Sequence, residues 1–514
     1  MLKVIYTSFL NKNIPSLIKI LEKKFVWKPE VIISAEKLKE TAKLNFSNSY
    51  HIDASDLRLA HFDYSKFGKK IPIDAHILKK LSNYESNFIN WIQDTNGRNF
   101  SWNERRSYYY DVLTYWNTLI NKLKPNLLFS FSWPHTITDY GLYLMCKHVY
   151  DIPVLFVDVI PFFNTNKRLT FISYENMSLT IDQEIDNSKK QQIDPVVQKY
   201  INDLKKKDNP FVHSNIINFF KNHSINYKNI FLDIMILIKN IVTFKIFSKV
   251  SFFYKKNSKP LNKKNQMNNF DFFLFKFKSI YKNFTIKNYY KSISSSPDYN
   301  TKYIYFPGNY EPEAQSNLVP GKYEDPFLIL NMLSSELPNG WKIFYKEHPA
   351  TFIVGGIGGL AKNKKFYEKL KSYDCVEVVP FNESTFKLID NSEAVISAGG
   401  TPGWEAMVRE KPCLLFGSQW YQGCSEVLKI DKLEDLRSSI ARVKNGFTPD
   451  VENIKNFTQC LYSSLLDNGE IINSKKSKVV NNADKDKIFN KLADDINKIY
   501  LKFYSKFENE KKNF

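Results

Sequence analysis

The chain has 514 residues, a hydrophobic fraction of 43% and a formal net charge of +20 at pH 7. This length exceeds the roughly 250 to 300 residues at which one hydrophobic core stops growing, so we expect at least two domains. The composition excludes a wholly disordered chain, and five scattered cysteines without a CxxC pair favour a reducing compartment over a disulfide or zinc framework.

The positive charge comes mostly from lysines spread along a chain that is also rich in Asn, Ile and Phe. No recognised nucleic-acid-binding module accompanies it, so we expect no nucleic-acid partner. An anionic membrane surface, or a phosphorylated donor and a lipid-linked acceptor, explains the charge equally well.

From residue 1 to about residue 174, short β-branched or aromatic runs alternate with stretches of helical spacing. This alternation predicts a parallel sheet covered by helices, the doubly wound, Rossmann-like form of the α/β class. The expected strands are LKVIYTS, EVIISA, NLLFSFS and PVLFVDV, and the clearest helices are residues 105–122 and 136–149.

The first residues, MLKVIYTSF, lack the basic n-region and cleavage site of a signal peptide, so we expect them to form the first strand. The most apolar window, residues 230–253, is interrupted by charged residues and is not expected to span a membrane. We therefore expect a cytoplasmic protein, with the inner-membrane surface as an alternative place of contact.

Residues 175–300 are rich in lysine and asparagine and contain no glycine, and apolar residues recur there at helical spacing. We expect a helical connector or insertion. Two interpretations remain open, namely a packed helical hairpin between two lobes and a basic amphipathic patch for a membrane surface.

A second alternating unit spans residues 301–468, and its runs KYIYFPG, WKIFYKEHP, VEVVPF, AVISAGG and PCLLFG predict another parallel sheet. Residues 469–514 form a polar, lysine-rich tail that is expected to end in a helix near residues 487–507. Ligands of doubly wound sheets bind beyond the carboxyl ends of the strands, so the residues after each strand are the candidates for a site.

The stretch AVISAGGTPGWEAMV is the most informative of these strand ends. The residues expected to hold a phosphate are those of its turn, namely Ser397, Gly399, Gly400 and Thr401. Thr401 is a candidate N-cap and Pro402 suits the first helical position. Glu405, one turn into the helix, can accept hydrogen bonds from ribose hydroxyls. An ordinary strand-to-helix turn explains the same spacing.

The stretch YKEHPA follows another expected strand. Pro349 holds His348 extended, so the imidazole is expected to project beyond the strand end and donate to a phosphate or a leaving-group oxygen. Lys346 and Glu347 alternate in direction, so at most one of them should face a ligand, and Lys346 is the one expected to contact the nucleotide-sugar. A structural turn histidine is the alternative.

The loop FPGNYEPEAQSNLVPG carries Tyr310, Glu311 and Glu313 after the first strand of the second unit. These side chains are expected either to contact a substrate or to belong to a solvated loop.

The first unit offers carboxylates for acid–base chemistry. His135 and Asp139 lie at a strand-to-helix junction, Asp158 ends the next strand, and Arg168 follows ten residues later. A carboxylate there can deprotonate an acceptor or stabilise positive charge developing on a sugar. Helix capping is the alternative role for His135 and Asp139.

The run FIVGGIGGLAK has four glycines but matches neither GxGxxG nor a P-loop, so we expect a mobile loop. No DxD-type pair follows a strand, and no metal site is expected.

The runs KEHPA and SAGGTPGWEAMVREKPCLLFGSQWY, with WPHTITDYGLYLMCKHVYDIPVLFVD and YFPGNYEPEA, resemble the capsule polysaccharide biosynthesis proteins, which include bacterial Kdo transferases. The likeness covers roughly residues 105–175 and 300–425. It implies a GT-B fold, with an acceptor-binding first lobe and a second lobe that holds the nucleotide.

This resemblance implies a glycosyltransferase of surface polysaccharide synthesis that transfers a sugar, such as Kdo from CMP-Kdo, to a glycan or glycolipid acceptor without a further cofactor. His348 and Pro349 match the HP element of that family, and Tyr421 matches the aromatic residue after the Phe-Gly strand. The other carried-over positions are Ser397, Gly399, Gly400, Thr401 and Glu405 in the second lobe and His135, Asp139 and Asp158 in the first.

The sequence departs from the family at GGTPGW, where Pro402 is inserted before Gly-Trp, and at Asp158, which stands where glutamate is frequent. The donor therefore stays open. A UDP-sugar transferase, a nucleotide-sugar epimerase and a non-catalytic, membrane-docked assembly or export factor are the competing predictions.

Overall fold

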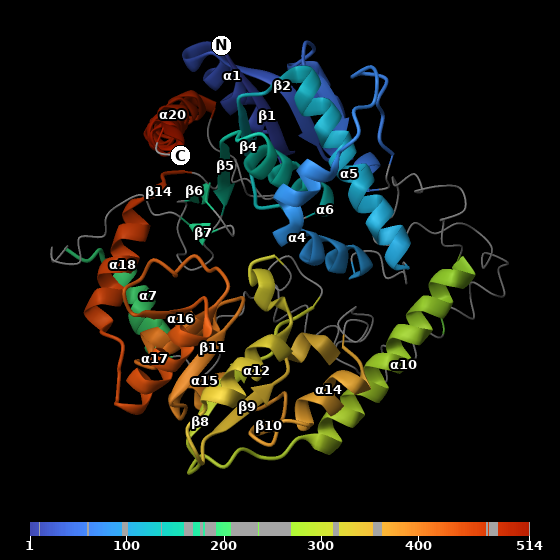
Figure 1. Ribbon diagram of the computed structural model, residues 1–514. Coiled ribbons are helices and arrows are strands. Elements are labelled where there is room, and N and C mark those ends of the chain that lie inside the picture. Colours follow the sequence, from blue (N-terminus) through green and yellow to red (C-terminus); the bar gives the residue numbers. More distant parts are fainter. Residues whose placement is uncertain are drawn as a thin grey trace.

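The structure is a computed structural model of the chain. It describes residues 1–9, 11–58, 61–94, 101–134, 136–158, 168–174, 178–179, 192–206, 235, 269–311, 318–352, 362–468, 471 and 482–512. Two lobes, each built on its own sheet, make up this part of the chain (Figure 1).

The first sheet has a parallel body with strand order β3-β2-β1-β4-β5. Its strands are β1 (Leu2–Phe9), β2 (Trp27–Ser34), β3 (Tyr50–Asp53), β4 (Leu127–Ser130) and β5 (Val154–Asp158). The strand order reverses between β1 and β4, and it matches the first five strands of the 3-2-1-4-5-6 Rossmann order. The predicted strands are confirmed, and β3 is an addition.

Beyond β5 the sheet continues with antiparallel strands, which the sequence did not indicate. They are β6 (Arg168–Tyr174), β7 (Ser178–Leu179) and β14 (Leu465–Leu466). Nine residues separate β5 from β6, fewer than the dozen or so that a parallel crossover needs, so β6 returns antiparallel.

Helices cover both faces of the first sheet (Figure 1). They are α1 (Ile14–Phe25), η1 (Glu36–Leu38), α2 (Lys39–Asn45), α3 (Ala54–Arg58), α4 (Ala75–Asp94), α5 (Trp102–Leu123), α6 (Ile137–Leu144) and the π-helical turn η2 (Met145–Val149). Ser101 and Glu104 form a capping box that begins α5. The two helices expected in this lobe are confirmed as α5 and as α6 with η2.

The second sheet is wholly parallel, with strand order β10-β9-β8-β11-β12-β13. Its strands are β8 (Tyr303–Pro307), β9 (Lys342–Lys346), β10 (Val376–Val378), β11 (Ala394–Ser397), β12 (Cys413–Phe416) and β13 (Val427–Ile430). This is the 3-2-1-4-5-6 order of a complete Rossmann fold. The predicted doubly wound class is therefore confirmed in both lobes.

The helical elements of the second lobe connect these strands. They are η6 (Gly321–Glu324), α12 (Pro326–Glu336), η7 (Pro349–Phe352), α14 (Lys364–Lys371), α15 (Thr385–Asp390), α16 (Pro402–Val408), α17 (Leu433–Lys444) and α18 (Val451–Ser463). On η6, Gly321 O accepts from Asn87 Nδ2 at 2.7 Å and Glu324 Oε1 accepts from Asn90 Nδ2 at 2.8 Å. These bonds join α4 of the first lobe to the second.

Two helices of the connecting segment pack on the second lobe. On α7 (Pro195–Lys206), Tyr200 accepts a hydrogen bond of 2.8 Å from the Trp404 indole. On α10 (Asn269–Ile293), Tyr290 donates to Val379 O at 2.7 Å. Most of the apolar run at residues 230–253 lies outside the described residues, so its two interpretations stay open.

The last helix, α20 (Asn482–Lys512), returns to the first lobe and lies against α1 (Figure 1). Its buried residues join the apolar layer on that face of the sheet, and they include Phe489, Leu492, Ile496 and Tyr500. The Tyr500 and Trp27 rings meet edge to face, with centroids 5.0 Å apart. The two ends of the sequence thus build one lobe.

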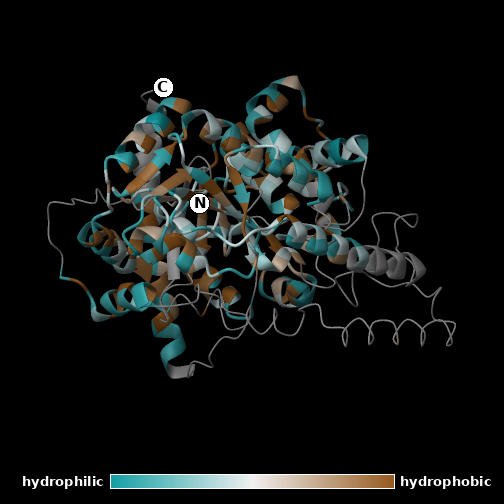
Figure 2. Ribbon diagram, turned by 90° about the horizontal axis from the view of Figure 1, so that it is seen from below, coloured by the Kyte–Doolittle hydropathy of each residue, from teal (hydrophilic) through white to brown (hydrophobic). Residues whose placement is uncertain are grey.

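Side chains alternate between two apolar layers along each buried strand. In β8, Tyr303 and Tyr305 face one layer, whereas Ile304 and Phe306 face the other. Figure 2 shows the strands as mainly hydrophobic ribbons between helices of mixed character. A sheet covered on both faces needs apolar residues at every strand position, which explains the continuous apolar runs in the sequence.

Candidate functional site

The carboxyl ends of β8 and β11 lie side by side at the point where the strand order of the second sheet reverses. Open parallel sheets bind ligands outside such a switch point. The loops that follow β8, β9 and β11 all leave this edge of the sheet. The three segments singled out in the second half of the sequence are therefore brought to one edge.

Two glycines shape the passage from β11 into α16, Gly400 in the turn and Gly403 in the helix. Gly400 has a φ of +86°, in the left-handed region that favours glycine. At Gly403 an added Cβ would lie 2.4 Å from Cys413 Sγ and 2.7 Å from the Tyr421 hydroxyl oxygen. The absence of a side chain therefore lets α16 start directly against β11 and β12.

Thr401 occupies the N-cap position of α16, as predicted, but its side chain does not cap the helix. The Thr401 hydroxyl donates instead to Glu405 Oε1 at 2.8 Å, and Glu405 is buried. The expected capping interaction is wrong because the backbone of Thr401 is helical, whereas a capping side chain needs an extended N-cap residue.

Ser397 and Tyr421 support this loop from inside the lobe. Their hydroxyl groups are 2.8 Å apart, and the Tyr421 hydroxyl donates to Gly400 O at 3.3 Å. Both side chains are buried. In the described structure they fix the backbone of the turn, and a contact of either with a nucleotide remains a prediction.

Lys346, the last residue of β9, is directed into the protein. Its Nζ donates to Glu383 O at 3.0 Å and to the Thr385 hydroxyl group. Burial lowers the pKa of Lys346 to about 8. The side chain ties the end of β9 to the start of α15.

His348 stands one residue beyond Glu347, at the turn into η7. Its Nδ1 accepts a hydrogen bond of 3.1 Å from Ala350 N, so the neutral ring carries its proton on Nε2. Burial lowers the pKa of His348 to about 4, which keeps the ring neutral at physiological pH. The ring of Tyr310, from the loop after β8, lies 5.9 Å away. The tautomer makes Nε2 a hydrogen-bond donor, the role predicted for it.

A buried ion pair that the sequence did not reveal lies behind His348. Lys362 Nζ lies 3.0 Å from Glu347 Oε1 and donates to Asn309 O at 2.9 Å. Glu347 also accepts hydrogen bonds from Tyr345 and Tyr367. Lys362 closes the glycine-rich run, and no local pattern connects it to a glutamate fifteen residues earlier in the sequence.

The loop after β8 contributes to the same cluster. An added Cβ at Gly308 would lie 2.7 Å from the Tyr345 hydroxyl and 3.0 Å from Glu347 Oε1, so this position accepts only glycine without rearrangement. Glu311 Oε1 lies 3.6 Å from Lys362 Nζ. Burial raises the pKa of Glu311. Glu313 lies outside the described residues.

The switch point of the first sheet carries hydroxyl groups that the sequence analysis missed. Ser8, at the end of β1, has a φ of 56°, and its Oγ lies 3.4 Å from Ser130 Oγ at the end of β4. The neighbouring Thr7 Oγ1 is buried and has no hydrogen-bond partner in the described part of the chain. A buried hydroxyl without a partner is costly, so this edge is a second candidate for ligand contact.

The first-lobe residues predicted for catalysis follow β4 and β5. Asp139 is half-buried in the first turn of α6, where its backbone N–H donates to the Thr136 hydroxyl at 3.2 Å. Thr136 therefore caps the helix. Asp158 is the last residue of β5, Arg168 is the first of β6, and His135 lies outside the described residues.

Within the described ranges, no group of His, Cys, Asp or Glu side chains is arranged to hold a metal ion. None of the helices described is both long and apolar enough to cross a bilayer.

Neither a scan against protein-family models nor a search of curated proteins found a match. Solved structures give matches, one being the UDP-GlcNAc 2-epimerase from Methanocaldococcus jannaschii, at 14% identity over 90% of this chain and 99% of that one, with a TM-score of 0.23. KpsC, a β-Kdo 2,7 transferase from Thermosulfurimonas dismutans, is 14% identical over 63% of this chain and 79% of its own, with a TM-score of 0.26.

A glycosyltransferase from Rickettsia africae ESF-5 is 11% identical over 90% of this chain and 93% of its own, with a TM-score of 0.24. Because these TM-scores are low, the fold assignment rests on the strand orders of the two sheets. Two Rossmann-like lobes, with a terminal helix that returns to the first, define a GT-B-like α/β protein.

Proposed function

We propose that this protein is a glycosyltransferase that moves a sugar from a nucleotide-activated donor to a glycan or glycolipid acceptor. The observation that carries the proposal is the edge of the second sheet where the Gly400 turn and the His348 turn flank the end of β8. A glycine-bounded turn into a helix and a neutral imidazole donor suit a nucleotide phosphate.

In the proposed reaction an acceptor hydroxyl attacks the anomeric carbon as the bond from that carbon to the phosphate oxygen breaks. The bonding electron pair leaves with the nucleotide, and the acceptor proton passes to a carboxylate. Asp139 is the proposed base because it is a half-buried carboxylate beyond the carboxyl end of β4. Asp158 and His135 stay as further candidates from the sequence.

The finer proposal is a CMP-activated acidic sugar such as Kdo, used in surface polysaccharide synthesis. It is supported by the sequence resemblance at the HP and Gly-Thr segments. Calorimetric titration of the full chain with CMP, UDP and GDP tests it, and we expect CMP to bind most tightly. Binding of UDP alone would remove the Kdo assignment, and binding of no nucleotide would remove the transferase itself.

Asp139→Asn tests the proposed base separately from donor binding. General-base catalysis contributes about 10²–10⁴-fold, so turnover should fall within that range while nucleotide affinity is retained. Asp111→Asn, at an exposed first-lobe carboxylate on α5, is the control and should leave turnover unchanged. Turnover of Asp139→Asn at the wild-type level would assign the base elsewhere.

A further inference from the structure

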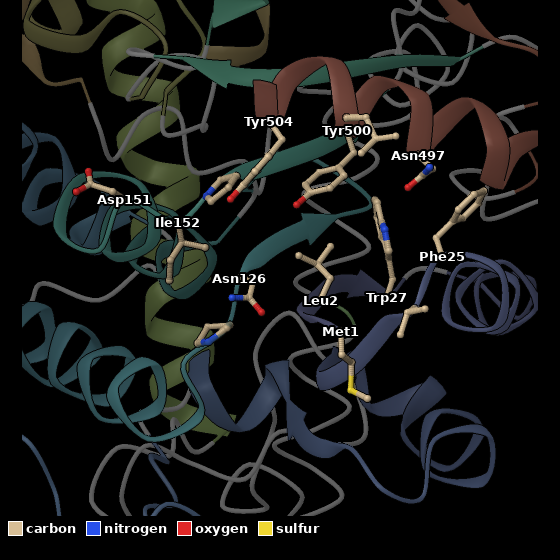
Figure 3. Close-up of a pocket in the computed structure, with 14 residues that line it drawn as sticks. Met1, Leu2, Phe25, Trp27, Asn126, Asp151, Ile152, Asn497, Tyr500 and Tyr504 are labelled. Carbon is tan, nitrogen blue, oxygen red and sulfur yellow. The ribbon is translucent and has the colours of Figure 1, made fainter. Parts of the chain in front are cut away.

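A cavity of about 530 Å³ lies in the first lobe at the amino ends of its strands, away from the edge where the candidate site begins. Figure 3 shows Tyr500 projecting from α20 toward Trp27 and Leu2, and Tyr504 projecting on the side of Ile152. The turns before β4 and β5 complete the wall. The cavity is thus built where the first strands of the chain meet its last helix.

Large apolar side chains at this cavity are open to solvent. The exposed fractions are 57% for Leu501, 50% for Val26 and 38% for Tyr504. Val26 also has a φ of 61°, a conformation that is strained for a β-branched residue. Exposed apolar residues that cluster around a hollow are typical of an interaction surface, whereas single apolar residues scattered over a surface are not.

The surroundings of the cavity are basic. Lysines adjoin its lining residues directly in the chain at Lys3, Lys24, Lys28, Lys124, Lys498 and Lys502. Lys24 and Lys28 pair with Asp494 and Glu30. The acidic residue of the lining is Asp151. Lys3 Nζ donates to Leu123 O. Six lysines and Asp151 are thus the charged residues at or next to the lining in the sequence, a balance that suits negative charge.

The sequence of α20 changes character at this surface. Its first part, residues 482–495, contains four aspartates and three lysines. The next part, residues 496–507, INKIYLKFYSKF, contains three lysines and no acidic residue, and Glu508 and Glu510 follow before the helix ends. Tyrosines and lysines mixed with apolar residues are typical of helices that lie in the interface of a membrane. The cavity-lining residues of α20 all belong to this second part.

We propose that this face of the first lobe, defined by Val26, Leu501, Tyr504 and the cavity between them, docks on a bilayer that contains anionic phospholipid. The apolar rim enters the boundary between headgroups and acyl chains, the tyrosines lie among the headgroups, and Lys124, Lys498 and Lys502 approach the lipid phosphates. The carboxyl edges of both sheets stay open, so docking and the proposed transfer reaction are compatible.

Flotation of the full chain with phosphatidylglycerol-containing vesicles tests this proposal. The variant Val26→Asn/Leu501→Gln removes exposed apolar area, while asparagine tolerates the left-handed φ and glutamine favours a helix. We expect its vesicle partition to fall about tenfold. Lys498→Gln/Lys502→Gln should weaken binding by a similar factor, because each lysine near an anionic surface strengthens binding about fivefold or less. Binding of the wild type should fall on pure phosphatidylcholine and with added salt.

Leu44→Gln is the matched control, because Leu44 is an exposed leucine of the same lobe that lies outside the cavity. It should float like the wild type. Wild-type flotation by Val26→Asn/Leu501→Gln, or no flotation of the wild type, would overturn the proposal. A concentration-dependent dimer that the double variant abolishes would also overturn it, by assigning this face to a second copy of the chain.

Discussion

Lys362 Nζ and Glu347 Oε1 are 3.0 Å apart, with both side chains buried at the carboxyl edge of the second sheet. The pair joins the turn that carries His348 to the end of the glycine-rich run. The nearby carboxylates of Glu311 and Glu347 raise the pKa of Lys362 above its usual value although burial acts against it. The charged form of this lysine is thus part of the folded state.

We expect Lys362→Met to lower the free energy of unfolding by about 3 kcal/mol or more, because it leaves a buried glutamate without its cation. Urea titration monitored by circular dichroism measures this loss. The double variant Lys362→Met/Glu347→Gln should lose less than the sum of the two single variants, since the amide carries no charge.

Lys364→Met is the matched control for the buried pair. Lys364 also pairs with a glutamate, Glu368, but at an exposed position on α14. Exposed pairs contribute about 0–1 kcal/mol, so a small effect is expected. Equal losses for the Lys362 and Lys364 variants would contradict a special role for the buried pair.

Gly403→Ala should weaken nucleotide binding, because the new Cβ displaces α16 from Cys413 and Tyr421 and so moves the turn at Gly400. A decrease in affinity of at least about tenfold is expected from misplacing the phosphate donors, by calorimetric titration with the nucleotide that binds the wild type. Gly423→Ala is the control, since its Cβ would meet Phe457 at an ordinary 3.7 Å. Unchanged affinity in Gly403→Ala would show that the turn does not hold the phosphate.

His348→Gln and His348→Asn separate the two ring nitrogens. The Asn amide can replace Nδ1 and keep the bond to Ala350 N, whereas the longer Gln amide can replace the Nε2 donor. If Nε2 donates to the nucleotide, affinity should be largely retained in His348→Gln and should fall about tenfold in His348→Asn and His348→Ala. The reverse order would show that nucleotide affinity depends on the Nδ1 bond that holds the turn, and not on a contact between Nε2 and the nucleotide.

Both sheets could be predicted from the sequence because their strands are buried on two faces and read as continuous apolar runs. The strand β11 is one of these apolar runs. The turn after it could also be predicted, because Ala394–Ser397 is followed at once by glycines and a proline. In contrast, β3 is a short edge strand with the polar sequence YHID, which no periodicity distinguishes from a loop.

Contacts between distant residues set the limit of such predictions. The ion pair between Lys362 and Glu347 cannot be predicted from the local sequence, because an isolated lysine after a glycine-rich run is normally expected to be exposed to solvent. The return of α20 to α1, marked by the Lys24 and Asp494 pair, joins positions 470 residues apart. The capping role expected of Thr401 fails because its backbone is helical, and the sequence of the turn does not reveal that conformation.

His148 provides a test of how acid acts on the first lobe. It lies in the π-helical turn η2, its ring stacks on Tyr84 with centroids 4.5 Å apart, and its Nε2 is buried without a hydrogen-bond partner in the described structure. Burial, with a smaller effect of Lys147, lowers the pKa of His148 to about 4 from its usual 6.5. The unfolded chain therefore binds the proton more readily than the folded lobe does.

This difference predicts that stability is lost as the pH falls from about 6.5 to 4, because protonation of His148 favours the unfolded state there. His148→Phe keeps an aromatic ring against Tyr84 but cannot be charged, so the loss between pH 6.5 and 4.5 should be smaller by about 1–2 kcal/mol, after allowance for partial exposure of the ring. Urea titrations at the two pH values measure it. Lys147→Met should reduce the loss only slightly, and an unchanged loss in His148→Phe would assign the acid sensitivity to other groups.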